Sequence, residues 1–268
     1  MKRPGFGRSL PCYGGGGGVR LELFDTHCHL DFLAEPRGFA DAAAQRGMGF
    51  FAATVTPAGY LLARESLADA PNVRLGVGLH PWWVHDGRCD LADAQRVAEL
   101  VRETRFVGEV GLDFGKRCVS SREQQVASFE CIACACAREG GKLLTVHAVR
   151  SAETVLDVLE ATGCLKNNQV IFHWYSDTSE GLWRAVRAGC SFSVNLRMLS
   201  TKRGREYARI LPADRLLLET DLPPEEYTAF PLDAWEQDLR EALRALEDVR
   251  GCACADTLAS NSRKILQL

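Results

Sequence analysis

Two histidines one residue apart follow the first apolar run of the chain, and their spacing could hold a metal ion. Residues 25–29 read DTHCH, directly after the apolar run LELF. A β-strand projects alternate side chains from one face, so His27 and His29 point the same way and Cys28 faces away. Neutral imidazoles are common ligands of divalent metals. The pair therefore predicts a metal site at the end of a strand.

Further metal-ligand side chains stand at the ends of later apolar runs. Glu109 lies in VGEVGLD, His147 in LTVHA, His173 in VIFHW and Asp221 in LLETDLP. One such histidine alone is more often a core residue, but four of the chain's six histidines belong to this pattern. Four imidazoles and two carboxylates suit two divalent ions. The nitrogen ligands favour Zn, Mn, Fe, Co or Ni over Mg.

The elements that must position these residues alternate along the chain. Eight β-rich runs are predicted at 21–26, 50–54, 73–78, 106–109, 143–146, 170–172, 191–194 and 216–219. Helical patterns are predicted at 38–46, 58–69, 91–103, 121–139, 152–161, 178–188, 202–210, 232–248 and 256–266. This alternation predicts an α/β fold, a TIM (β/α)₈ barrel, in which side chains at the carboxyl ends of the strands converge. An open doubly wound sheet is the alternative, but it favours a glycine-rich loop after the first strand.

Composition excludes several classes of protein. The chain has 268 residues, of which 46% are hydrophobic and 25% charged, and its formal net charge is −3. No global positive field draws it to nucleic acid or membrane, and no apolar stretch reaches the ~18 residues of a membrane span. Residues 1–19 lack a signal-peptide core and contain five consecutive glycines. We expect a disordered tail over 1–19, one domain over 20–268 and a cytoplasmic location.

Six segments carry a family resemblance. FDTHCHLD, GLHP, VGEVGLD, VHAVR, FHWYS and LLLETDLP span nearly all of residues 23–223, and NSR follows in the last helix. They resemble, in order, the signature blocks of the TatD family of metal-dependent deoxyribonucleases. The resemblance implies an amidohydrolase-like barrel, two metal ions, and 3′→5′ exonuclease or endonuclease activity on DNA. It implies that one ion is held by His27, His29 and Asp221, the other by His147 and His173, and that Glu109 bridges both.

The loops that would face substrate depart from the family pattern. After His173 the chain reads WYSD, where members usually have CFSG. Arg150 lies three places beyond His147 instead of two, and VNLRM replaces a stretch of small residues after the seventh strand. The metal ligands of the family are thus present, whereas the substrate loops differ.

The implied reaction is hydrolysis by a water molecule that two metal ions activate. Asp221 could also accept the proton of that water. Glu219 and Asp25 share the strand faces of the ligands and could orient them, although a buried structural hydrogen bond is an equal alternative. His80, in GLHPWW, could orient substrate, and His85 is expected in a surface loop.

A nucleic-acid substrate needs cations and stacking planes near the metals. Candidate cations follow the fourth, fifth and seventh strands: Lys116, Arg117, Arg150, Arg197, Lys202, Arg203 and Arg205. Candidate stacking residues follow the third and sixth strands: Trp82, Trp83, Trp174 and Tyr175. Each group could instead be a solvated surface or loop packing. From these we take His80, Arg150, Trp174, Arg197, Lys202 and Arg203 as substrate-binding candidates and DNA, single-stranded or at a 3′ end, as the expected partner.

Two other functions remain open. The same scaffold could cleave a lactone, an amide or a small phosphoester. Many amidohydrolase relatives bridge their metals with a carboxylated lysine, and Glu109 at that position favours the TatD branch. Alternatively, the eleven cysteines could make a metal-loaded or redox protein centred on Cys131, Cys134 and Cys136. The simpler interpretation is that these cysteines pack as small apolar residues, because no second C-x-x-C supplies four ligands.

Overall fold

The structure is a computed structural model that describes residues 20–268. The expected tail over residues 1–19 lies outside the described residues. Among the described residues, no helix is both long and apolar enough to cross a membrane. The cytoplasmic location stays a prediction.

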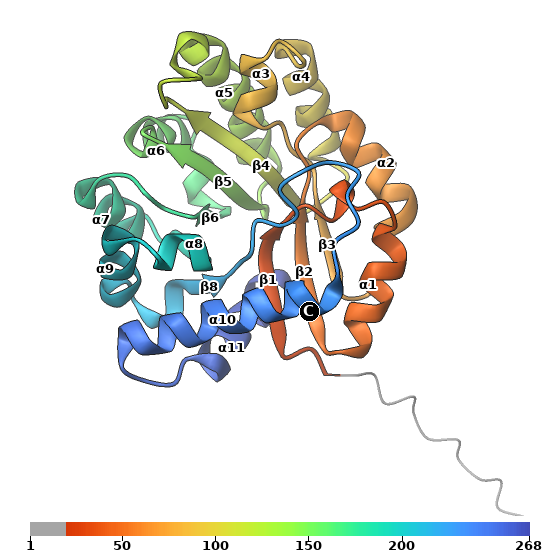
Figure 1. Cartoon of the computed structure of the whole chain (residues 1–268). Helices are drawn as coiled ribbons and strands as arrows, with labels where there is room; N and C mark the ends of the chain where they lie inside the picture. Colours follow the sequence, from red (N-terminus) through yellow and green to blue (C-terminus); the bar gives the residue numbers. More distant parts are fainter. Residues whose placement is uncertain (1–19) are drawn as a thin grey trace, which may run out of the picture.

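Strands and helices alternate through the described residues, and the helices surround the strands (Figure 1). The strands are β1 (Leu23–Cys28), β2 (Met48–Ala53), β3 (Val73–Gly76), β4 (Phe106–Asp113), β5 (Leu143–Val149), β6 (Gln169–His173), β7 (Ser191–Val194) and β8 (Leu216–Leu218). The helices are α1 (Pro36–Gln45), α2 (Pro57–Leu67), α3 (Pro81–His85), α4 (Leu91–Leu100), α5 (Arg122–Glu139), α6 (Ala152–Ala161), α7 (Ser179–Arg187), α8 (Leu196–Leu199), α9 (Lys202–Ile210), α10 (Leu232–Arg250) and α11 (Ala255–Leu266).

The strands pair in parallel and in chain order, as β1–β2–β3 and β4–β5–β6–β7–β8. Backbone hydrogen bonds join the two sheets at both junctions. The Val77 amide donates to the Phe106 carbonyl at 3.1 Å, and the Asp221 amide donates to the His27 carbonyl at 3.0 Å. The ring of strands therefore closes. The predicted (β/α)₈ barrel is confirmed, and the open doubly wound sheet is wrong.

Two apolar layers hold the barrel. The larger lies between strands and helices, where small and branched residues of both are buried. The smaller cluster joins side chains of five strands to the last helix: Phe24, Phe51, Leu143, Ile171, Leu217, Ile265 and Leu266. The Asn261 side chain donates to the carbonyls of Ala213 and Leu216, both at 2.9 Å. Helix α11 therefore packs against the end of the barrel at which the strands begin.

Several element boundaries differ from the prediction, and the differences concern the site. Strands β1, β5 and β6 extend past their predicted ends, so His27, His147 and His173 lie within strands. The short helices α3 and α8 were predicted as loops. They are too short to show a helical hydrophobic period, which needs several turns to be recognised.

Glu109 was predicted at the end of the fourth strand and lies in its middle. The register with β5 shifts between Val107 and Val110, which marks an irregularity in the strand at Glu109. Glycine is required beside it: Gly111 has φ +136°, and a Cβ there would lie 2.1 Å from the His147 carbonyl oxygen. The missing side chain lets β4 and β5 approach closely enough to bring Glu109 and His147 together.

Candidate metal centre

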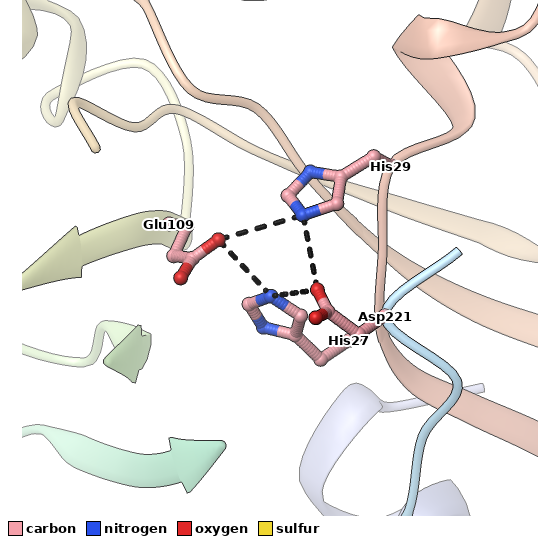
Figure 2. Close-up of side chains that lie close together, drawn as sticks. All are labelled: His27, His29, Glu109 and Asp221. Carbon is pink, nitrogen blue, oxygen red and sulfur yellow. Dashed lines mark hydrogen bonds and ion pairs between the residues drawn. The ribbon is translucent and has the colours of Figure 1, made fainter. Parts of the chain in front are cut away.

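The six predicted ligands lie together where the strands end, and four of them form one compact group (Figure 2). His27 Nε2 lies 3.2 Å from Glu109 Oε2 and 3.7 Å from Asp221 Oδ1. His29 Nε2 lies 3.4 Å from each of the same two oxygens. Strands β1 and β4 and the chain after β8 thus aim four ligand atoms at one point.

The second oxygen of Glu109 faces another set of imidazoles. Glu109 Oε1 lies 2.8 Å from His147 Nδ1, 2.9 Å from His173 Nε2 and 3.1 Å from His80 Nε2. Glu109 is 2% exposed and stands between both sets. One carboxylate therefore has a different group of nitrogens on each of its oxygens.

The spacing of the first group fits a metal ion. Ligand bonds of ~2.1 Å in tetrahedral geometry place neighbouring ligand atoms ~3.4 Å apart. The Nε2 atoms of His27 and His29 lie 3.2 to 3.7 Å from the facing oxygens of Glu109 and Asp221. Two imidazoles and two carboxylates are also a donor set that divalent transition metals accept.

Hydrogen bonds on the far side of each ring orient the imidazoles. His27 Nδ1 lies 2.6 Å from the Thr145 hydroxyl, and His29 Nδ1 lies 3.1 Å from the Ala53 carbonyl oxygen. A carbonyl only accepts, so His29 Nδ1 carries a proton, and Nε2 is the nitrogen that faces the site and could bind a metal ion.

His80 is placed differently from the six ligands. Its Nδ1 accepts the backbone amide of Trp82 at 3.1 Å, so the proton is on Nε2. That Nε2–H donates to Glu109 Oε1. Burial lowers the pKa of His80 to about 4, which keeps the ring neutral. His80 therefore supports Glu109 and does not offer a lone pair.

The carboxylate of Glu109 is ionised. Burial alone would raise its pKa, but the neighbouring imidazoles of His80, His173 and His27 and the hydrogen bond with His147 together hold it well below the usual range. Burial likewise disfavours a charged His29, yet its hydrogen bonds to Asp221 and Glu109 raise the pKa of that imidazole. The negative charge of the centre comes from the carboxylates of Glu109 and Asp221, whose pKa values are both lowered, and it favours a bound cation.

Glu219 and Asp25, both candidates to orient ligands, have different roles. Glu219 is fully buried, accepts from Ser193 and from Asn195 Nδ2, and lies 3.6 Å from His173 Nδ1. Asp25 instead accepts from Thr220 Oγ1 at 2.6 Å and from Trp235 Nε1 at 2.8 Å. Because the register of β1 shifts after Asp25, this carboxylate joins β1 to α10 and does not line up with the ligands.

Asp113 is a site residue that the sequence analysis did not single out. Its Oδ2 lies 3.4 Å from His147 Nε2 and accepts from Trp82 Nε1 at 2.6 Å. Burial raises its pKa, but these hydrogen bonds and that from the Gly115 amide outweigh burial and lower the pKa to about 2. One feature of the sequence could have pointed to Asp113: it is the last residue of VGEVGLD, at the end of the strand that carries Glu109.

A cavity of ≈ 520 Å³ opens over the centre. Within residues 20–268, its walls include Trp82, Trp83, Trp174 and Arg197, and metal-site residues form its floor. The remaining substrate candidates are exposed residues outside these walls: Arg150, Lys202 and Arg203. Of these, Arg203 donates to the carbonyl of Ser176, which does line the cavity.

Tyr175, which the sequence suggested as a residue that could stack on a base, is not available for that role. It is 1% exposed and packs against Phe172, Phe192 and Tyr207. Its neighbour Trp174 has φ +41°, in the left-handed region that a bulky residue rarely adopts. This turn sends successive side chains to opposite sides, so Trp174 reaches the cavity while Tyr175 enters the core.

His85, expected in a surface loop, ends α3 and contacts the Ser121 hydroxyl at 3.2 Å.

The cysteines do not assemble a second centre in the part of the chain that the structure describes. All groups there that could hold a metal consist of histidines and carboxylates. Cys131 and Cys134 are half-buried on α5 and Cys136 is buried. The geometry therefore favours packing as the role of these cysteines.

Comparison with known proteins decides the family. A model described as TatD related DNase matches residues 24–267. The chain belongs to this family. An uncharacterized metal-dependent hydrolase of Escherichia coli, YcfH, is 30% identical over 213 residues, which cover 75% of this chain and 77% of that protein. The 3′-5′ ssDNA/RNA exonuclease TatD of Pantoea ananatis is 30% identical over 149 residues, which cover 54% of this chain and 56% of that protein.

Solved structures support the same fold. The TatD homologue YJJV of Escherichia coli superposes with a TM-score of 0.76 at 21% identity and covers 92% of this chain and 98% of its own. At that identity the likeness shows the fold alone. Family and fold together establish a TatD-family barrel of the metal-dependent hydrolase type.

Proposed function

We propose that this protein is a deoxyribonuclease that hydrolyses phosphodiester bonds with two divalent metal ions, as a 3′→5′ exonuclease or an endonuclease. The observation that carries the proposal is the position of Glu109, which presents each carboxylate oxygen to a different set of imidazoles. A carboxylate placed between two such sets suits a bridging ligand.

In this proposal the two sets divide the ligands. His27, His29 and Asp221 would hold one ion, His147 and His173 would hold the other, and Glu109 would offer one oxygen to each. When bound, two such ions lower the pKa of a water molecule and polarise a phosphoryl oxygen. The identity of the metals is open among Zn, Mn, Mg, Fe, Co and Ni.

The side chains around the ligands have separate tasks. Asp221 is the ligand with the most exposed side chain, at 20%, so it is placed to accept the proton of the attacking water. Arg197, with its guanidinium 5.8 Å from the Trp174 ring centre, would bind a phosphate beside a stacked base. Arg150, Lys202 and Arg203 would contact the strand outside the cavity. The name of the Pantoea ananatis relative supports nucleic acid as the substrate class.

The decisive experiment compares the protein with a Glu109→Gln variant on labelled single-stranded DNA with Mn²⁺ or Mg²⁺. We expect the variant to lose ~10³-fold in rate, because an amide neither bridges two cations nor balances their charge. Glu130→Gln, an exposed change on α5, is the matched control and should keep the parent rate. Equal rates for the parent and Glu109→Gln would contradict the proposal.

A second candidate is hydrolysis of a small ester, such as a lactone or a phosphoester. The walls of the cavity favour it, because they are mainly aromatic residues and prolines with Arg197 as the cation among them. The same preparations should therefore also be tested on a lactone and on an aryl phosphodiester. Turnover of these, lost in Glu109→Gln, without cleavage of DNA would favour the second candidate.

A further inference from the structure

Trp82 and His147 contact the same oxygen of Asp113. The indole Nε1–H of Trp82 donates to Asp113 Oδ2 at 2.6 Å, and His147 Nε2 lies 3.4 Å from that oxygen. The rings of Trp82 and His147 also meet edge to face, with centres 6.0 Å apart. A residue of the cavity wall is thus joined through one carboxylate to a ligand of the candidate metal centre.

The Asp113 side chain is held from the opposite side. Its Oδ1 accepts the Gly115 amide at 2.7 Å. The buried Gln125 side chain of α5 accepts the Asp113 amide at 2.8 Å and donates to its carbonyl at 3.1 Å. With the backbone and Oδ1 fixed, the Trp82 bond sets the direction of Oδ2. The carboxylate has little freedom to turn away from His147.

A carboxylate lies beside each ring nitrogen of His147: Glu109 Oε1 is 2.8 Å from Nδ1, and Asp113 Oδ2 is 3.4 Å from Nε2. A carboxylate only accepts, so a hydrogen bond from Nε2 to Asp113 requires the Nε2–H tautomer. Without a metal ion, Glu109 Oε1 competes for a proton on Nδ1, 2.8 Å away. A metal ion bound at Nδ1 would leave Nε2 to carry the proton and Asp113 to accept it. The opposite tautomer would point a proton at the position of the metal. Partners of this kind orient imidazole ligands and raise their basicity.

We infer that Trp82 and Asp113 are positioning residues that hold His147 in the tautomer and orientation needed to bind the second metal ion. The inference rests on the proposed function only in taking His147 as a ligand. Trp82 has two tasks, because it also lines the cavity. Its ring is further held by Arg117, whose guanidinium lies 5.5 Å from the ring centre and is paired with Asp86.

The test measures Zn²⁺ and Mn²⁺ binding by competition with a chromophoric chelator, in the parent and in Trp82→Phe and Asp113→Asn. Trp82→Phe keeps an aromatic wall and removes only the donor. We expect one of two metal equivalents to bind about 10-fold to 100-fold more weakly in both variants. Trp183→Phe is the matched control, because Trp183 is a partly exposed residue of α7 that does not line the cavity. It should bind both equivalents with the parent affinity.

A second measurement is independent of metal and of any substrate. Nitrogen-15 spectra of the metal-free protein at alkaline pH report the tautomer of each histidine, with His147 assigned by its loss in His147→Gln. The parent should populate the Nε2–H form of His147, and Asp113→Asn should lower that population in favour of the Nδ1–H form. Failure of the parent to bind metal would contradict the proposed function, while the tautomer would still decide this inference.

Three results would overturn the inference. One is parent metal affinity in both Trp82→Phe and Asp113→Asn. Another is equal weakening of both metal equivalents, which would indicate general disruption, since Asp113 contacts His147 and none of the ligands of the first ion. The third is an Nε2–H population of His147 in the metal-free protein that Asp113→Asn leaves unchanged.

Discussion

Glu109 is the residue about which the candidate centre is arranged. It contacts His27 and His29 through one oxygen and His147, His173 and His80 through the other. All five imidazoles are buried beside it, and burial strengthens each charge interaction that it makes. Residue types and strand spacing were enough to predict the six ligands as a set. The donor role of His80 was not predictable, because it follows from the backbone amide that occupies its other nitrogen.

Arg197 offers a prediction about substrate binding. Arg197→Ala should raise KM for a phosphodiester substrate about 10-fold or more with little change in kcat, because a hydrogen bond to a charged group contributes ~1.5–3 kcal/mol. Steady-state kinetics measure this, with Arg187→Ala on the exposed side of α7 as the control. An unchanged KM would remove Arg197 from the substrate site.

The cysteines offer a prediction about reactivity. Burial raises the pKa of the Cys190 thiol to about 12, so at neutral pH it is both protonated and inaccessible. Iodoacetamide on the native protein should therefore modify the exposed Cys252 and leave Cys190 and Cys28 unmodified. Mass spectrometry of peptides locates the label. Rapid modification of Cys190 in the folded protein would show that the reagent reaches this thiol and would contradict the prediction.

At the scale of elements, strand β4 and the short helices α3 and α8 shape the site. The irregularity of β4 at Glu109 and the close approach of Gly111 to β5 set where Glu109 and His147 meet. Helices α3 and α8 carry Trp82 and Arg197 into the cavity walls. Periodicity predicts long regular elements well. It does not predict a strand irregularity or a helix of one turn, which depend on neighbouring strands and local caps.

Two glycine substitutions test how closely β4 and β5 must approach: one glycine is in a crowded site between these strands, and the other, a control, is in open space. Gly111→Ala should lower the free energy of unfolding by roughly 3 kcal/mol or more, because its Cβ would overlap the His147 carbonyl and its φ is +136°. Gly38→Ala, in α1 with open space around the new methyl group, should raise stability by about 0.4–1 kcal/mol. Urea denaturation compares them. A Gly111→Ala protein as stable as the parent would show that β4 and β5 can separate without loss.

At the scale of the whole molecule, closure of the barrel joins β1 to the elements that follow β8. Asp25 on β1 binds Thr220 after β8 and Trp235 on α10. Arg263 on α11 donates to the carbonyl of Leu21 at 2.8 Å. These contacts join residues about two hundred positions apart. Displacement of α10 or α11 would therefore disturb β1, which carries His27 and leads directly into His29.

The packing of α11 gives the prediction at this scale. Leu266 is fully buried in the cluster that includes Phe24, Phe51 and Ile171. Leu266→Ala should lower the free energy of unfolding by about 2–5 kcal/mol, as other large-to-small core changes do. Leu62→Ala, at a site that is 66% exposed, should change it little. Calorimetry distinguishes the two, and similar losses would mean that α11 is not part of the core.

Local sequence patterns were enough to identify the family and the barrel and to predict six candidate ligands. Each follows from local patterns: alternating elements, residue types at strand ends, and signature segments such as FDTHCHLD and VGEVGLD. Only the tertiary structure decided the contacts around that set. Asp25 joins α10, Asp113 faces His147, and Tyr175 enters the core while Trp174 lines the cavity. These depend on strand register, on backbone turns and on partners from distant elements, which local spacing does not specify.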